Sequence, residues 1–280
     1  MRQQTYVNNK PTLYLVATPI GNMSEFTPRA IEVLKSVSVI ACEDTRTSKV
    51  LLNHFDIKTP LASYHKFNEK ESVDKFVAYL DEGKDIALIS DAGYPLVSDP
   101  GSVLVREVID KGYNVTTISG ASAFLNALVA SGFSMTRFTF VGFLDSKSGA
   151  RKKQLNELIN NKETLIFYES PHRIVDMLKD MLEILGDRNI VLARELTKKF
   201  EEYIRGKISD VLLDVENFKG EMVVIVEGSQ QKETIVDNYT LIEEIKRLKE
   251  ENRTNKEIIC ILCEKYKLKK NDVYDLVCKK

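Results

Sequence analysis

The sequence has few cysteines and no long hydrophobic run. Four cysteines are scattered over 280 residues, too few for the disulfide framework of a secreted domain. No apolar stretch approaches the ~20 residues that span a bilayer. The polar start, residues 1–6, also lacks the apolar segment of a secretion signal. We therefore expect a cytoplasmic protein with reduced thiols and no membrane partner.

An excess of charge of either sign is also absent. The chain has 40 basic and 41 acidic residues, a net charge of −1. Contact with nucleic acid must therefore come from a local basic patch. With 280 residues, 43% of them hydrophobic, the chain is long enough for two domains with a substantial core.

The glycine patterns of the common nucleotide-binding loops are missing. The first strand-end loop, Thr18–Asn22, has one glycine, so it is neither a phosphate-binding P-loop nor a dinucleotide-binding turn. This argues against a kinase or an NAD enzyme. Cys260 and Cys263 have a C-x-x-C spacing, but no second pair of ligands lies nearby, so we expect no metal.

What the chain does have is an alternation of short β-rich runs with helical patterns, typical of an α/β fold. We expect an N-terminal α/β domain over 1–130, a second α/β domain over 131–228 and a helical C-terminal extension over 229–280. The extension would start with a polar linker, 229–237, followed by short helices. The expected strands are 13–17, 37–42, 85–89 and 115–118 in the first domain, and 138–142, 164–168, 190–194 and 222–227 in the second.

Three loops follow strands of the first domain: Thr18–Asn22, Ser90–Gly101 and Ser119–Ala123. In an open parallel sheet such strand ends face one crevice, where ligands bind. Taken alone, the first loop favours an ordinary strand-to-helix turn, whereas the small residues of the third loop serve helix packing equally well. Asp91 can accept hydrogen bonds from an ammonium or a ribose hydroxyl, whereas Asp99, before Pro100, is expected to cap the next helix.

Charged residues gather at other strand ends. Glu43, Asp44 and Arg46 follow the second strand, and His172 lies beside Glu169 and Arg173. Charges at a crevice are costly unless used or paired. The simpler alternatives are that Asp44 caps a helix while paired with Arg46, and that His172 is a surface histidine. A basic cluster, Lys147, Arg151, Lys152 and Lys153, could contact phosphates or form a solvated helix face.

Taken together, these segments resemble the RsmI-type 16S ribosomal RNA methyltransferases, which share the tetrapyrrole methylase fold. The resemblance runs from about Leu13 to the C-terminus. It rests on Leu-Val-Ala-Thr-Pro-Ile-Gly-Asn at 15–22, Ala-Cys-Glu-Asp-Thr-Arg at 41–46, the loop 90–101, Phe-Tyr-Glu-Ser-Pro-His-Arg at 167–173, Ala-Arg-Glu-Leu-Thr-Lys at 193–198 and Lys-Gly-Glu-Met at 219–222. The chain departs from the family pattern at Tyr94, usually Thr or a small residue, and at Ser119-Gly120-Ala121, usually Pro-Gly-Pro.

The resemblance implies methyl transfer from S-adenosylmethionine to the ribose 2′-hydroxyl of a cytidine in the decoding centre of 16S ribosomal RNA. It also implies a homodimer without metal, with RNA or the small ribosomal subunit as partner. The expected cofactor-binding residues are Pro19, Gly21, Asp91, Ala92, Gly93, Ser119, Gly120, Ala121, Ser122, Ala193, Arg194, Glu195, Gly220 and Glu221.

For the reaction itself, a general base must partly remove the hydroxyl proton. The candidates are Asp44, Glu43 and His172, and the sequence does not rank them. Arg46 and Arg173, with Lys147, Arg151, Lys152 and Lys153, are the expected RNA contacts.

Two other functions remain open. A tetrapyrrole methyltransferase has the same fold and cofactor, but it needs neither the C-terminal extension nor the Glu-Asp-Thr-Arg segment. A non-catalytic nucleic-acid-binding protein would read DNA with its helical tail. Residues 231–280, however, hold 12 basic and 10 acidic residues, a weak electrostatic footprint for such a module.

Overall fold

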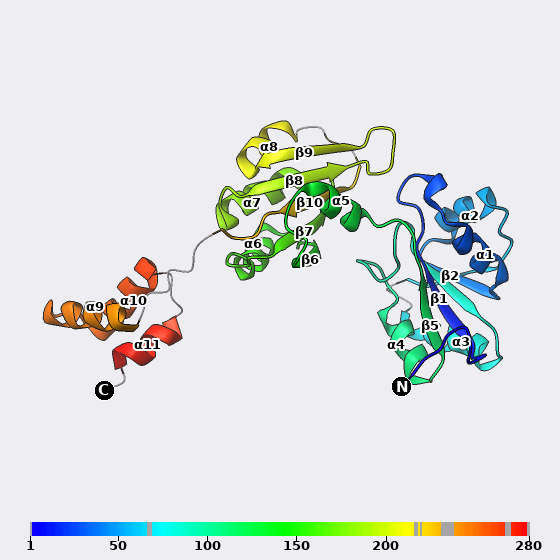
Figure 1. Ribbon diagram of the computed structural model, residues 1–280, viewed down its shortest axis with the longest axis horizontal. Coiled ribbons are helices and arrows are strands. Elements are labelled where there is room, and N and C mark those ends of the chain that lie inside the picture. Colours follow the sequence, from blue (N-terminus) through cyan, green and yellow to red (C-terminus); the bar gives the residue numbers. More distant parts are fainter. Residues whose placement is uncertain are drawn as a thin grey trace. The chain divides into compact units, whose positions relative to one another are not determined.

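The computed structural model describes residues 2–65, 69–215, 218, 220–230, 238–266 and 270–278 (Figure 1). The chain divides into two compact units, 1–229 and 230–280, which are described separately. The first unit contains two five-stranded sheets. It therefore has the mixed α/β architecture that the alternating pattern predicts.

The first sheet is entirely parallel, with strand order β3-β2-β4-β1-β5. Four of its strands were predicted to within two residues at either end, because each is a short run rich in apolar or β-branched residues. β3 was missed, since three residues are too few to show a pattern. The strands are β1 (Thr12–Val16), β2 (Val39–Cys42), β3 (Leu61–Ser63), β4 (Ile86–Ile89) and β5 (Asn114–Ile118).

Five α-helices alternate with or follow these strands. They are α1 (Pro28–Ser36), α2 (Thr45–His54), α3 (Glu69–Asp81), α4 (Ser102–Asp110) and α5 (Ala123–Ser131), and a short 3-10 turn, η1 (Met23–Glu25), precedes α1. The last helix, α5, packs on the second sheet through Ala127 and Leu128, which share a core with Val191 and Ile225. The two sheets are thereby joined in one unit.

The helix caps test two sequence predictions. The pair Thr27-Pro28 is typical of a helix start, and α1 does begin there, with the Thr27 hydroxyl accepting a hydrogen bond from the Ala30 N–H at 3.1 Å. Asp99 does not cap α4, because that helix begins only at Ser102 and its N-cap is Gly101, with no side-chain hydrogen bond. The prediction that Asp99 caps this helix is therefore wrong, and the residue instead lines the cavity described below.

The second sheet has the order β6-β7-β10-β8-β9. Only β6 and β7 pair in parallel, and every other neighbour is antiparallel. β9 was missed because its sequence, EYIRGK, is mostly polar. The elements are β6 (Phe138–Phe143), α6 (Ser148–Glu157), β7 (Thr164–Glu169), α7 (Ile174–Leu185), β8 (Asn189–Arg194), β9 (Glu202–Lys207), α8 (Ile208–Asp214) and β10 (Met222–Val226).

The unit 230–280 consists of α9 (Asn238–Glu250), α10 (Asn255–Tyr266) and α11 (Lys270–Cys278). These helices enclose an apolar core of their own, which includes Leu241, Ile258 and Val273. Thr254 and Glu257, three residues apart, form a capping box at the start of α10, since they exchange hydrogen bonds of 2.8 and 3.3 Å. Most of the predicted linker, 231–237, and Lys269 lie outside the described residues. Across the described helices, none is long and apolar enough to cross a membrane.

Candidate functional site

The loops after β1, β4 and β5 meet at one edge of the first sheet. Thr18 and Gly93 exchange backbone hydrogen bonds of 2.9 and 3.0 Å, which tie the first loop to the second. A Cβ added at Gly93 would lie 3.5 Å from Ile20 and 3.8 Å from the Ala121 carbonyl oxygen, so the third loop is also in contact. The predicted convergence of these strand ends is confirmed.

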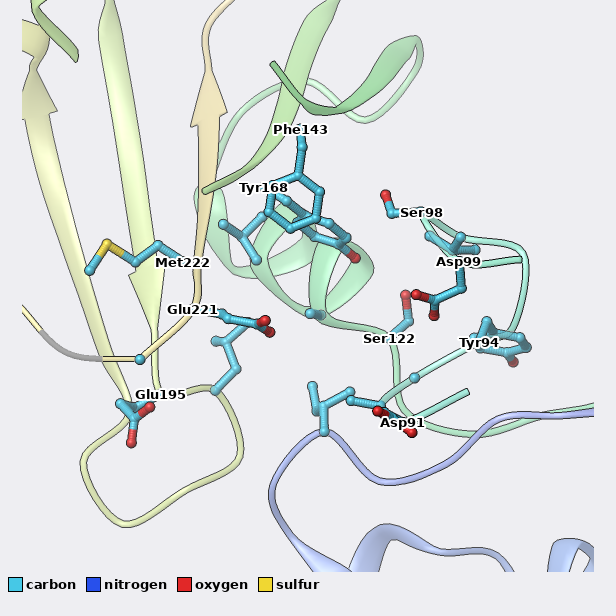
Figure 2. A pocket seen from close by; sticks show the side chains of 18 of the residues that line it. Asp91, Tyr94, Ser98, Asp99, Ser122, Phe143, Tyr168, Glu195, Glu221 and Met222 are labelled. Atoms are coloured by element: carbon cyan, nitrogen blue, oxygen red, sulfur yellow. The ribbon is translucent and has the colours of Figure 1, made fainter. Parts of the chain in front are cut away.

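A cavity of about 570 Å³ opens beside this edge (Figure 2), well within the usual size of a ligand site. The first sheet contributes its strand-end loops, and the second sheet contributes the opposite wall. The lining residues are Ile20, Glu43, Asp91, Ala92, Gly93, Tyr94, Val97, Ser98, Asp99, Ser122, Ala123, Phe143, Tyr168, Glu195, Leu196, Lys198, Gly220, Glu221, Met222 and Val223.

The lining is strongly acidic. It contains five carboxylates, Glu43, Asp91, Asp99, Glu195 and Glu221, and among these lining residues the one cationic side chain is Lys198. Burial, together with the neighbouring charges of Glu43, Asp91 and Glu221, raises the pKa of Asp99 to about 6. Burial also raises the pKa of Asp91. A cavity that holds so many carboxylates favours a cationic ligand.

The wall from the second sheet depends on two glycines. A Cβ at Gly21 would lie 2.5 Å from Lys198 Cε, and a Cβ at Gly220 would lie 2.1 Å from Glu195 Oε1. Lys198 and Glu195 form an ion pair of 2.9 Å. A side chain at either glycine would displace Lys198 or Glu195, and it would be strained by the φ of +143° at Gly21 and of +80° at Gly220.

The comparisons with known proteins agree with this geometry. Residues 12–212 match the family model of the Tetrapyrrole (Corrin/Porphyrin) Methylases. Ribosomal RNA small subunit methyltransferase I of Bacillus subtilis (strain 168) is 44% identical to this chain over 98% of both proteins. The protein of the same name from Haemophilus influenzae is 45% identical over 94% of both. The chain belongs to the ribosomal RNA small subunit methyltransferase I family.

Solved structures share the fold of this methyltransferase family member. Uroporphyrin-III-C-methyltransferase from Thermus thermophilus aligns with a TM-score of 0.56 at 18% identity, over 78% of this chain and 94% of that one. Diphthine synthase aligns with a TM-score of 0.61 at 12% identity, over 80% and 92%. The predicted tetrapyrrole methylase fold with a helical C-terminal extension is thus confirmed.

Eight of the predicted site residues line the cavity: Glu43, Asp91, Ala92, Gly93, Ser122, Glu195, Gly220 and Glu221. The other predicted cofactor-binding residues are not among the lining residues: Pro19, Gly21, Ser119, Gly120, Ala121, Ala193 and Arg194. Lys219, part of the same sequence motif, lies outside the described residues.

The Gly120 amide and the Arg194 side chain are already engaged by the protein. The Gly120 N–H donates to the Tyr94 hydroxyl at 3.2 Å. Arg194 pairs with Glu202 at 2.5 Å and its guanidinium lies 4.7 Å from the centre of the Phe218 ring. Cofactor binding by these two residues stays a prediction.

Asp44 takes the simpler of its two predicted roles. Its carboxylate caps α2 by accepting the Arg46 N–H at 2.8 Å and pairs with the Arg46 guanidinium at 2.8 Å. Those hydrogen bonds lower the pKa of Asp44 to about 2, and such a weak base is poorly suited to take a hydroxyl proton near neutral pH. His172 is exposed and outside the cavity lining. Of the three predicted bases, Glu43 is the one in the cavity wall.

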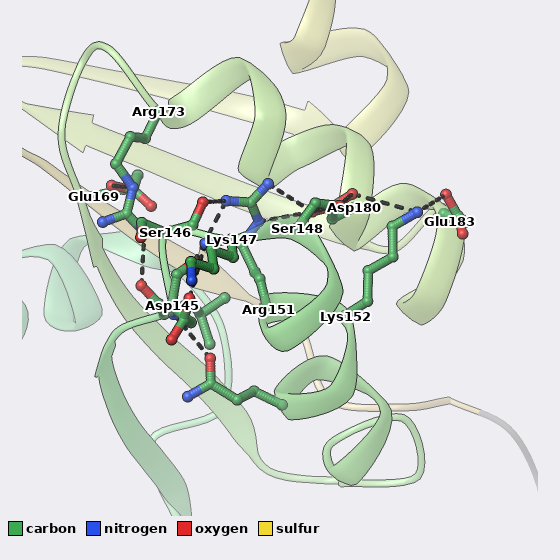
Figure 3. Close-up of polar contacts among 12 residues, drawn as sticks. Asp145, Ser146, Lys147, Ser148, Arg151, Lys152, Glu169, Arg173, Asp180 and Glu183 are labelled. Carbon is green, nitrogen blue, oxygen red and sulfur yellow. Dashed lines mark hydrogen bonds and ion pairs between the residues drawn. The ribbon is translucent and has the colours of Figure 1, made fainter.

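The basic cluster divides into buried and exposed side chains (Figure 3). Arg151 is 4% exposed and pairs with Asp180 at 2.6 Å, and Lys152 pairs with Glu183 at 2.6 Å. Burial leaves no free face of Arg151 for a phosphate, so that prediction is corrected. Lys147 and Lys153 are exposed, so their contact with RNA phosphates stays a prediction.

Arg173, also predicted to hold phosphate, binds the protein itself. Its guanidinium pairs with the fully buried Glu169 at 3.3 Å and donates to the Leu144 carbonyl at 2.6 Å. The Arg173 side chain is still 31% exposed, so its predicted phosphate contact stays a prediction.

Several lining residues were missed by sequence reasoning. Asp99 was misread because Asp-Pro is a common helix start, and Tyr94 lay within a loop already singled out. Phe143 and Tyr168 read as ordinary strand residues, and no local signal marks them. Burial raises the pKa of Tyr168 to about 12, so its hydroxyl stays protonated.

Across the described residues, no group of three or more His, Cys, Asp or Glu is placed to hold a metal ion.

Proposed function

We propose that this protein transfers a methyl group from S-adenosylmethionine to the ribose 2′-hydroxyl of a cytidine in the decoding centre of small-subunit ribosomal RNA. The single observation that carries the proposal is the acidic cavity of about 570 Å³ at the strand ends. The names of the relatives, ribosomal RNA small subunit methyltransferase I, support RNA as the acceptor.

The cavity suits the chemistry of this cofactor. S-adenosylmethionine carries a sulfonium and an ammonium, and Asp99, Asp91 and Glu221 offer carboxylates to both. The raised pKa of Asp99 results in part from repulsion by nearby carboxylates, and a bound cation would relieve that repulsion. Leu196, Met222 and Val223 supply apolar surface for the adenine.

Positioning is the main catalytic task of these residues. The cofactor supplies a methyl carbon on a positively charged sulfur, which leaves with the bonding electrons as the ribose oxygen attacks. Alignment of that oxygen with the methyl carbon accounts for roughly 7–11 kcal/mol of barrier lowering in well-oriented reactions. We assign Glu43 the role of proton acceptor, because it lines the cavity whereas Asp44 and His172 do not. Arg46, with a side chain 90% exposed, remains a proposed phosphate contact.

We also propose that the working assembly is a homodimer. Two apolar side chains of α5, Leu125 and Val129, are exposed on the single chain and are available for such a contact. Sedimentation equilibrium should give twice the chain mass of 31.8 kDa, and a mass of one chain at micromolar concentration would contradict the dimer.

The reaction is tested with methyl-labelled S-adenosylmethionine and three acceptors: small ribosomal subunits, naked 16S ribosomal RNA and a tetrapyrrole. We expect label on RNA, at a nucleotide whose 3′ phosphodiester bond resists alkaline cleavage because its 2′-oxygen is methylated. The Glu43→Gln variant should lose turnover while it keeps cofactor affinity, and Asp44→Asn should retain turnover. Label on the tetrapyrrole alone would contradict the proposed acceptor, and label on a base nitrogen or carbon would contradict the 2′-oxygen.

A further inference from the structure

Phe143 is a large apolar side chain that the fold leaves half exposed at the wall of the cavity. Its exposed fraction is 47%, and it ends β6. A single exposed apolar residue is ordinary on a protein surface. Phe143, however, lines the cavity and packs against a second lining ring, Tyr168, with centroids 5.5 Å apart (Figure 2).

A row of aromatic rings supports Phe143 from behind. Tyr168 also contacts Phe140, with centroids 5.2 Å apart, and Phe140 contacts Phe124 at 4.9 Å. Phe143 is thus the outermost of four rings that run from the core to the cavity.

An irregularity in β6 puts Phe143 in this row. Residues three apart in a regular strand point to opposite faces of the sheet, yet Phe140 and Phe143 both contact Tyr168. The pairing of β6 with β7 shifts register between Phe140 and Gly142, and Gly142 has a φ of +74°. Such bulges re-aim side chains, and here the bulge turns Phe143 toward the cavity.

The segment after Phe143 is fixed by two charged side chains (Figure 3). Arg173 donates to the Leu144 carbonyl at 2.6 Å, and Arg151 donates to the Ser146 carbonyl at 3.3 Å. Both guanidiniums are neutralised by buried carboxylates, Glu169 and Asp180. The Phe143 ring therefore sits on a backbone that is held before any ligand arrives.

We propose that Phe143 is a stacking platform for a nucleobase of the RNA substrate at the mouth of the cavity. The inference rests on the proposed RNA acceptor. Proteins recognise single-stranded RNA largely by stacking its bases on aromatic side chains. The exposed Lys147 follows four residues later and can contact the phosphate of the stacked nucleotide.

Stacking here would hold a base that has left its neighbours in the RNA and keep its ribose near the methyl donor. Unstacking a base costs a few kcal/mol, and an aromatic partner for the base offsets that cost. The platform therefore contributes to the binding of RNA and leaves the binding of the cofactor alone.

The absence of tryptophan from the chain allows a direct test. Phe143→Trp keeps an aromatic surface and introduces a single tryptophan, which can be excited at a longer wavelength than the 11 tyrosines of the chain. We expect its emission to be quenched by a single-stranded RNA oligonucleotide containing cytidine and to be unchanged by S-adenosylmethionine alone. Phe200→Trp is the matched control, since Phe200 is 68% exposed and outside the cavity lining, and its emission should not respond to the RNA beyond nonspecific quenching.

A second variant, Phe143→Leu, keeps apolar bulk without a ring. We expect it to lower affinity for the oligonucleotide, and to raise KM for small ribosomal subunits, by about tenfold, with cofactor affinity within twofold of wild type. Phe200→Leu should match wild type. Thermal unfolding midpoints identify any variant that is misfolded.

Three results would overturn the platform. Unchanged RNA affinity in Phe143→Leu, with a wild-type enzyme that methylates RNA, refutes the platform and leaves the proposed function intact. Quenching of Phe143→Trp by S-adenosylmethionine alone, with a loss of cofactor affinity in Phe143→Leu, would assign the ring to the cofactor adenine. A wild-type protein that neither binds nor methylates RNA would refute both proposals.

Discussion

Asp99 is a residue whose environment opposes its own charge. Burial and neighbouring carboxylates raise its pKa from 3.8 to about 6. Its protonated form therefore stabilises the folded state, fully below pH 4, and that contribution is lost as the pH rises through 6. A group held at such a cost in free energy is typical of a binding site.

Asp99→Asn removes this penalty. We expect the variant to gain about 1 kcal/mol of unfolding free energy relative to wild type between pH 4 and pH 7.5, an amount already reduced for screening by solvent. Urea unfolding at the two pH values measures the difference. If the difference in unfolding free energy between the variant and wild type does not change with pH, the environment described for this carboxylate is contradicted.

Gly220 allows the close approach of Glu195 to the chain before β10. A Cβ at this position would lie 2.1 Å from Glu195 Oε1, and its φ is +80°. We therefore expect Gly220→Ala to destabilise the protein by about 1–3 kcal/mol and to weaken cofactor binding. Gly149→Ala is the control, because no atom lies within 4 Å of the added Cβ. Equal stability of the two variants would contradict this account of the second wall.

At the scale of elements, α6 and α7 are linked by a buried ion pair. Arg151 and Asp180 are 4% and 9% exposed and 2.6 Å apart, and Ser148 adds a hydrogen bond to Asp180 at 3.0 Å. Removal of Arg151 would leave the buried Asp180 carboxylate with only the more distant and partly exposed Lys152, at 3.6 Å, as a counterion, which is costly for a buried charge. The pair therefore fixes the geometry of the loop between β6 and α6.

Arg151→Leu tests whether this arginine supports the fold or contacts RNA. We expect the variant to lose roughly 3–5 kcal/mol of unfolding free energy, as measured by chemical denaturation. Lys153→Ala, on the exposed face of the same helix, should change stability by less than about 0.5 kcal/mol. An Arg151→Leu variant with wild-type stability and weakened RNA binding would restore the phosphate role.

The sequence predicts elements better than it predicts the cavity. Short runs of apolar and β-branched residues locate eight of the ten strands, and strand-end loops locate one wall of the site. The roles of Asp99 and Arg151 could not be predicted, because each depends on a partner far along the chain: Glu43 and Glu221 for Asp99, and Asp180 for Arg151. The place of Phe143 in the cavity wall depends on the bulge in β6, and the neighbouring residues in the sequence give no signal for that bulge.

At the scale of the whole molecule, every residue that lines the cavity lies within unit 1–229. The unit 230–280 has its own apolar core and its own partly buried polar cluster, in which hydrogen bonds from Lys265 and Tyr266 lower the pKa of Glu244.

A chain that ends at Ser229 should therefore fold and bind S-adenosylmethionine within about twofold of the full-length affinity. In thermal unfolding, the shortened chain should keep the transition of the unit 1–229, which contains the cavity. A loss of cofactor binding in a shortened chain that remains folded would show that residues 230–280 contribute to the site.

The central claim is that the acidic cavity binds the cationic methyl donor through ionised Asp99. Calorimetric titration with S-adenosylmethionine at pH 5.0 and 7.5 tests it most directly, with Asp44→Asn as the control carboxylate outside the cavity lining. We predict that wild type and Asp44→Asn bind about tenfold more tightly at pH 7.5, because Asp99 ionises near pH 6. Asp99→Asn should bind weakly at both pH values. Affinity in Asp99→Asn equal to wild type, or no binding by wild type at either pH, would contradict the account.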